Sequence, residues 1–90
     1  MDVVRKRVLV SGYVQGVSFR YYCLREAQRA GVAGWATNLP DGRVEAVFEG
    51  SPDAVDRLVE WCRHGPSAAE VSGIEVVEEP PEGLRRFEIS

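Results

Sequence analysis

The chain has 90 residues, of which 44% are hydrophobic and 28% are charged, and its formal net charge at pH 7 is −3. This size suits one globular domain, residues 1–90, and no apolar run is long enough to cross a membrane. The acidic balance argues against a nucleic-acid partner. The chain also begins without an apolar segment and cleavage site, so we expect a cytoplasmic location and no membrane partner.

Basic residues gather near the beginning of the chain. Between Val3 and Arg25 there is no Asp or Glu, whereas five Lys or Arg residues occur from Arg5 to Arg25. A local excess of positive charge on an acidic chain favours a small anionic substrate over a polyanion.

The two cysteines, Cys23 and Cys62, do not form a CxxC pair and are too few for a disulfide framework. We interpret them as small buried apolar residues, although a bridge between them is the alternative. The chain has one histidine, His64, which is a poor candidate for a metal ligand or a base on its own. We therefore expect no metal and no cofactor.

The first predicted elements are a strand and a helix. Alternating apolar residues predict a strand from Val4 to Tyr13, which ends at the turn of Gln15-Gly16. Apolar residues at helical spacing then predict a helix from Phe19 to Ala30, with Ser18 as its N-cap. Gly31 is placed to end this helix in a left-handed cap.

A hairpin and a second helix follow. Strands are predicted from Ala33 to Leu39 and from Arg43 to Glu49, and the turn Pro40-Asp41-Gly42 between them indicates antiparallel pairing. Ser51-Pro52-Asp53 has the N-cap, proline and acidic residue that are typical of a helix start. Gly65-Pro66 ends this helix.

The remaining elements complete the expected fold. Strands are predicted over 71–78 and 86–89, separated by a loop rich in Pro and Glu. The order β-α-β-β-α-β with a short fifth strand predicts an α+β, ferredoxin-like (split βαβ) sandwich, with an antiparallel sheet and two helices on one face. The crossover makes the first two strands parallel, so their carboxyl ends share one edge and the third strand can lie between them.

The loop within Gly12–Arg20, GYVQGVSFR, is the first candidate site. Backbone N–H groups of a turn that enters a helix carry partial positive charge and favour an anion. Arg20 in the first helical turn opposes the helix dipole unless a negative ligand lies beside it. The topology should bring Asn38 to the same pocket. The simpler alternatives are a solvated helix residue for Arg20 and a turn residue with a local side-chain hydrogen bond for Asn38.

Together with GWATNLPDGRVEAVFEG (Gly34–Gly50), this segment resembles the acylphosphatase family. The likeness continues through Gly65-Pro66 and Ala69–Val71, and so covers nearly all of the chain. The main departure is Ala36-Thr37, where the family usually has a branched apolar residue and often a basic one. Arg20 and Asn38 are unaffected by it.

The resemblance implies hydrolysis of acyl phosphates to a carboxylate and inorganic phosphate, without metal or cofactor. Arg20 matches the family's phosphate-binding arginine, and Asn38 matches its water-positioning asparagine. Inorganic phosphate would be product and inhibitor, and we expect a monomer. The backbone N–H groups that match the family's phosphate-binding loop are those of Gln15, Gly16, Val17, Ser18 and Phe19.

Two other functions are compatible with this order of elements. RNA-recognition domains share it, but the third strand, RVEAVFEG, lacks the basic and aromatic pattern that stacks bases. A regulatory domain that binds phosphate or another anion without turnover is the second alternative. The presence of both Arg20 and Asn38 favours the enzyme.

Overall fold

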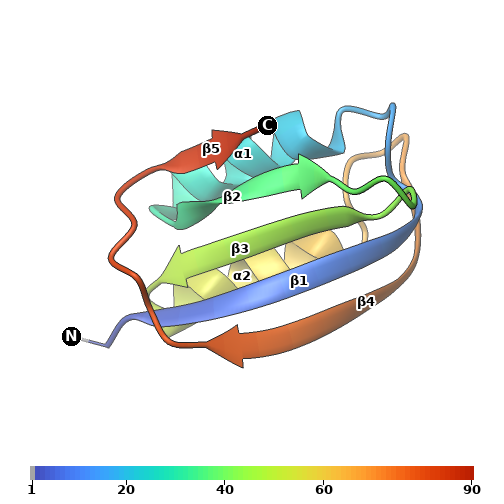
Figure 1. The fold of residues 1–90 in the computed structure, drawn as a ribbon. Coiled ribbons are helices and arrows are strands. Elements are labelled where there is room, and N and C mark those ends of the chain that lie inside the picture. Colours follow the sequence, from blue (N-terminus) through green and yellow to red (C-terminus); the bar gives the residue numbers. More distant parts are fainter. Residues whose placement is uncertain (1) are drawn as a thin grey trace.

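Residues 2–90 are described by a computed structural model, in which seven elements follow one another in the predicted order (Figure 1). The strand ends differ from the sequence prediction by one residue at most, whereas α2 ends at Cys62, before the predicted stop at Gly65-Pro66. The elements are β1 (Val4–Tyr13), α1 (Phe19–Ala30), β2 (Ala33–Asn38), β3 (Val44–Gly50), α2 (Pro52–Cys62), β4 (Glu70–Glu79) and β5 (Phe87–Ile89).

The strands form one sheet in the order β4-β1-β3-β2-β5, and both helices cover the same face of it (Figure 1). Strand β3 lies between β1 and β2, as predicted, and pairs antiparallel with both. The ferredoxin-like fold is confirmed, with one difference: β5 pairs parallel with β2, so the sheet is mixed. The long connection from β4 carries β5 to the far edge, where it runs in the direction of β2.

The core lies between the sheet and the helices, and both cysteines belong to it. Cys23 on α1 and Cys62 on α2 are fully buried and free. A hydrogen bond with the Cys62 thiol, together with burial, raises the pKa of Cys23 well above its ordinary value. Both side chains are therefore small buried residues of the core, as the sequence analysis predicted.

The two helices begin differently. At α2, Ser51 has an extended backbone and its Oγ accepts a hydrogen bond from the Ala54 N–H at 3.4 Å, as predicted for an N-cap. At α1, Ser18 precedes the helix but lies in the left-handed region with φ 60°, and no side chain caps the helix. The prediction of a capping role for Ser18 was wrong, because an N-cap needs an extended backbone to turn its oxygen over the first N–H groups. The end of α1 is as predicted, since Gly31 has φ 71°.

A buried ion pair on the open sheet face holds the connection between β4 and β5 in place. Arg5 and Glu49 are each 3% exposed, and the Arg5 Nη1 lies 3.4 Å from a Glu49 oxygen. Glu49 also accepts hydrogen bonds from the N–H groups of Glu82, Gly83 and Leu84 at 2.8–2.9 Å. Burial alone would raise the pKa of Glu49, but these hydrogen bonds and Arg5 lower it overall. The ionised Glu49 thus holds the segment that leads into β5.

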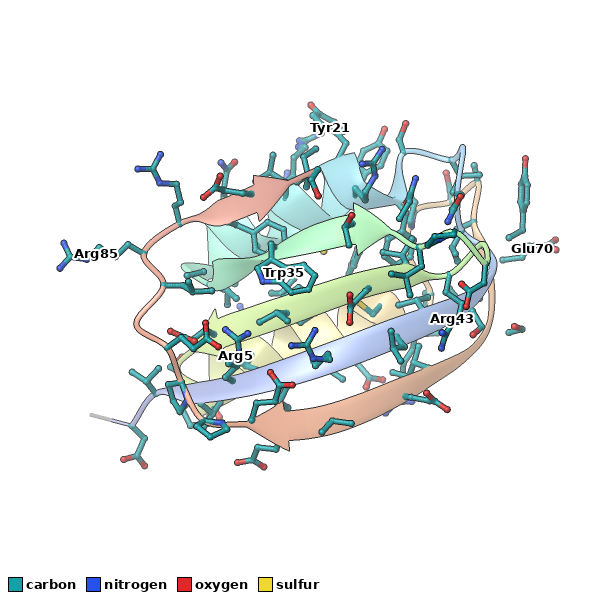
Figure 2. All side chains as sticks on the ribbon, in the orientation of Figure 1. Arg5, Tyr21, Trp35, Arg43, Glu70 and Arg85 are labelled. Carbon is teal, nitrogen blue, oxygen red and sulfur yellow. The ribbon has the colours of Figure 1, made fainter. Side chains whose placement is uncertain are left out.

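Side chains, and not a third layer, cover this open face (Figure 2). The guanidinium of Arg7 lies 5.4 Å from the centre of the Trp35 ring, and it also bonds to Glu45 and Glu79 at 2.7–2.8 Å. Trp35 and Arg7 therefore shield the sheet, as expected for an aromatic residue on a strand. Within residues 2–90, neither helix is long and apolar enough to cross a bilayer.

Candidate active site

A small pocket of about 190 Å³ lies where β1 leads into α1 and β2 ends. It is below the range of about 300–1,000 Å³ typical of sites for drug-sized ligands, and it suits a group the size of a phosphoryl-carboxyl unit. Two larger hollows, of about 550 and 450 Å³, border the β4–β5 connection but contain neither Arg20 nor Asn38. Chemistry, and not size, therefore identifies the site. The lining residues are Val14, Gly16, Ser18, Phe19, Arg20, Tyr21, Asn38 and Ile89.

The loop before α1 has an unusual backbone, with two residues in the left-handed region. Gly16 has φ 76°, with nothing near the position where a Cβ would stand, so glycine is needed there for backbone conformation. Ser18 also has a positive φ. Within residues 2–90, no side-chain oxygen accepts a hydrogen bond from the N–H groups of Gly16, Ser18 or Phe19. These donors are available to an anion.

Phe19 fixes the beginning of α1 in the absence of a side-chain cap. Its side chain is 2% exposed, and its ring centre lies 5.1 Å from that of Trp61 on α2. A Cβ on Gly65 would come within 2.6 Å of the same ring, so the segment after α2 also packs closely against it. Core packing thus holds the first turn of α1 in place. Phe19 is therefore a core side chain, and we expect its backbone N–H to serve the pocket.

Arg20 brings positive charge to the pocket from the first turn of α1, which contains no acidic residue. Its side chain is half-buried, and its Nη1 donates a hydrogen bond to the backbone oxygen of Ser90. Figure 1 shows the end of β5 beside the first turn of α1. One end of the guanidinium is therefore held by the chain, and a planar guanidinium has further N–H donors for an anion.

Asn38 is the last residue of β2 and is exposed on the opposite wall of the pocket. Within residues 2–90, its side-chain amide makes no hydrogen bond, so the local turn bond that was the simpler alternative is not formed. Arg20 and Asn38 line one pocket, as the topology predicted. The free amide can both donate and accept a hydrogen bond there.

Two of the predicted loop residues do not line the pocket. Val17 turns its side chain into the core, where it is 9% exposed. The Nε2 of Gln15 points to the β2–β3 turn, where it donates to the carbonyl oxygens of Leu39 at 2.8 Å and Arg43 at 3.0 Å. Gln15 therefore links the loop to the hairpin.

Sequence analysis missed the contribution of β5. Ile89 lines the pocket, and Ser90 accepts the hydrogen bond from Arg20. No local pattern marks these residues, because only the parallel pairing of Ile89 with Ala36 brings them here. His64 does not line the pocket. The described part of the chain, residues 2–90, contains no group of three or more His, Cys, Asp or Glu side chains that could hold a metal.

Nearly the whole chain is similar to known proteins. A family model described as Acylphosphatase matches residues 6–89. An acylphosphatase of Gloeobacter violaceus is 62% identical over 86 residues, which are 96% of this chain and 92% of that protein. The crystal structure of acylphosphatase from Bacillus subtilis has a TM-score of 0.93 at 41% identity, over 97% of this chain and 98% of that one. An acylphosphatase structure from Coxiella burnetii gives 0.95 at 36% identity, over 99% and 94%. This chain therefore belongs to the acylphosphatase family.

Proposed function

We propose that this chain hydrolyses the carboxyl-phosphate anhydride of acyl phosphates, with Arg20 and the loop N–H groups holding the phosphoryl group and Asn38 holding the attacking water. The observation that carries the proposal is the meeting of Arg20, Asn38 and the open loop in one small pocket. Within residues 2–90, that pocket is lined by no His, Asp or Glu. Its chemistry is that of anion binding and positioning.

The phosphoryl group is the part of the substrate that the pocket can recognise. Gly16, Ser18, Phe19 and Arg20 line one pocket, where their backbone N–H groups and the Arg20 guanidinium would donate to the phosphoryl oxygens. Charge on those oxygens changes during phosphoryl transfer, and donors fixed in advance stabilise it without reorganising. The phosphate-binding loop predicted from the sequence also includes the N–H groups of Gln15 and Val17. Their part in binding is proposed on their place in the same loop.

Attack by water needs positioning more than it needs a base. The leaving group is a carboxylate, which departs without protonation by a strong acid. The free amide of Asn38 can accept one hydrogen bond from a water and donate another, which would fix its direction toward the phosphorus. An amide is a very weak base, so we propose that the water's proton goes to solvent or to a phosphoryl oxygen of the substrate. The P–O bond to the carboxylate breaks as the bond to water forms.

The same geometry supports the expected small partners. Inorganic phosphate, the product, would occupy the Arg20 and loop donors and so inhibit the enzyme. We propose that the protein works as a monomer, because the site is built from one chain. We also propose a cytoplasmic location, in agreement with two buried cysteines that remain free. Gel filtration and cell fractionation test these two points.

The test is hydrolysis of benzoyl phosphate in the presence of a chelator, with the natural chain compared with Asn38→Ala. We expect turnover by the natural chain to be insensitive to the chelator. Turnover by the variant should fall by a factor of about 10²–10³, as for loss of one transition-state contact, while inhibition by phosphate stays within about twofold. A folded natural chain that binds phosphate without turnover would refute the proposal and indicate an anion-binding regulatory domain.

A further inference from the structure

The side chain of Gln15 makes the only side-chain hydrogen bonds, among residues 2–90, between the phosphate loop and the turn that follows Asn38. It is half-buried and projects from the loop between Val14 and Gly16, which both line the pocket. Its two hydrogen bonds end at the two strand ends of the β2–β3 hairpin. Loop and hairpin carry the two halves of the proposed site.

The acceptors of Gln15 determine which end of its amide faces the hairpin. Both are backbone carbonyls, of Leu39 and Arg43, and a carbonyl accepts hydrogen bonds but cannot donate them. The NH₂ end must therefore face them, and both of its hydrogens are used. The same two carbonyls also accept from the N–H groups of Gly42 at 3.2 Å and Leu39 at 2.8 Å. Gln15 thus completes a small network that closes the end of the hairpin.

This hydrogen-bond network involves the residues next to Asn38 and to its pairing partner. Leu39 follows Asn38 in the chain, and Val44, which follows Arg43, is the register partner of Asn38 across the β2–β3 pair. The Asn38 side chain has no hydrogen bond of its own within residues 2–90. Its direction therefore depends on the backbone that carries it, and Gln15 sets where that backbone stands relative to the loop.

We infer that Gln15 is a positioning residue: its amide holds the Asn38 end of the hairpin at the correct distance from the phosphate loop, so that the bound water is aligned with the phosphorus. The inference rests on the proposed function. The side chain of Gln15 touches neither substrate nor water in this scheme, so it acts on the chemical step through Asn38. Phosphate binding depends on Arg20 and the loop N–H groups and does not need the side chain of Gln15.

The decisive experiment is a double-mutant cycle of Gln15→Leu and Asn38→Ala, with benzoyl phosphate as substrate. Leucine keeps the approximate size of the side chain and removes both donors. We expect Gln15→Leu to lower kcat by a factor of about 10–100, since an error of about 1 Å in positioning can cost 10²-fold, and to leave inhibition by phosphate within about twofold. In the Asn38→Ala background the same change should lower kcat by less than about threefold, because nothing remains to be positioned.

Two further variants separate positioning from a general structural effect. Gln28→Leu removes an exposed amide from α1, outside the pocket, and should leave kcat unchanged. Gln15→Glu should have a low kcat at neutral pH, because its carboxylate repels the carbonyl oxygens of Leu39 and Arg43. Relative to the natural chain at each pH, it should recover activity as the pH falls and the protonated carboxyl regains one donor. A structural defect would show no such rescue.

The outcomes distinguish this inference from the proposed function. Failure of the natural chain to hydrolyse benzoyl phosphate would overturn both. Turnover by the natural chain, with equal losses from Gln15→Leu in the two backgrounds, would overturn only the positioning role. So would weakening of phosphate inhibition in step with kcat. Circular dichroism and phosphate binding establish that each variant is folded.

Discussion

The two helices of this protein solve the same physical problem in opposite ways. The first N–H groups of any helix lack partners within the helix. At α2, Ser51 caps them, Pro52 removes one donor and Asp53 adds the negative charge that the dipole favours. The first turn of α1 has no side-chain cap and no acidic residue, and the positive charge of Arg20 opposes the helix dipole. The chain thus caps the N–H groups at the start of α2, whose role is stability. It leaves those at the start of α1 uncapped, where we propose that an anion binds.

The open start of α1 is kept in place by tertiary contacts. A missing cap costs about 1 kcal/mol of helix stability. Burial of Phe19 against Trp61, and the αL cap at Gly31, can offset a cost of that size. Within residues 2–90 no side chain caps these donors, and core packing positions them instead, which is the preorganisation that an anion site needs.

The largest effect is expected from removing the cation at the start of α1. Arg20→Gln should lower kcat/KM for benzoyl phosphate by a factor of about 10³ or more and weaken inhibition by phosphate, because the charged clamp on the phosphoryl oxygens is lost. Arg25→Gln is the matched control, since Arg25 is an exposed arginine of the same helix outside the pocket. Steady-state kinetics of both variants measure the difference. Similar losses in the two would contradict the role of Arg20.

A second change makes the start of α1 resemble that of α2. Ser18→Asp places a carboxylate at the pocket, and aspartate tolerates the left-handed backbone found there. Its charge should compete with phosphate, so the inhibition constant should rise by about 10-fold or more, and the effect should shrink at high salt. Ser18→Asn has the same shape without the charge. An equal loss in that variant would show that shape, and not charge, is responsible.

The smallest effect concerns stability alone. Ser51→Ala should lower the free energy of unfolding by about 0.5–1 kcal/mol, because α2 loses its cap, and should leave kcat unchanged. Ser18→Ala should leave the free energy of unfolding nearly unchanged, because the Ser18 side chain caps nothing. Urea unfolding of the two variants compares the helix starts directly. A larger loss from Ser18→Ala would mean that the comparison is wrong.

Most of the fold could be predicted because its signals are local. Helix α1 was predicted over Phe19–Ala30, as observed, because its apolar spacing and Gly31 are contained in one short segment. The position of β3 between β1 and β2 followed from the handedness of crossovers. The conformation of Ser18 was missed, because serine before a helix usually caps it. Here Ser18 has a positive φ and lies directly before the buried Phe19.

The candidate site divides in the same manner. Arg20 and Asn38 could be named because each belongs to a short motif, and the topology predicted that both would face one pocket. No local pattern indicated the hydrogen-bond partners of Gln15, of Glu49 or of Arg20. These contacts join residues 24 to 70 positions apart. Contacts over such distances leave no local pattern to read.

By itself, the sequence determined which segments become helices and strands and the class of fold. It also determined the two residues that define the candidate site. Each of these depends on hydrophobic periodicity, turn residues or short motifs, which act over a few positions. Only the tertiary structure decided that β5 runs parallel to β2 and brings Ile89 to the pocket. It also decided that Glu49 holds the segment leading into β5 and that Gln15 spans the loop and the hairpin. The physical reason is that packing and hydrogen bonding depend on distance in space, and chain folding brings together residues that the sequence keeps far apart.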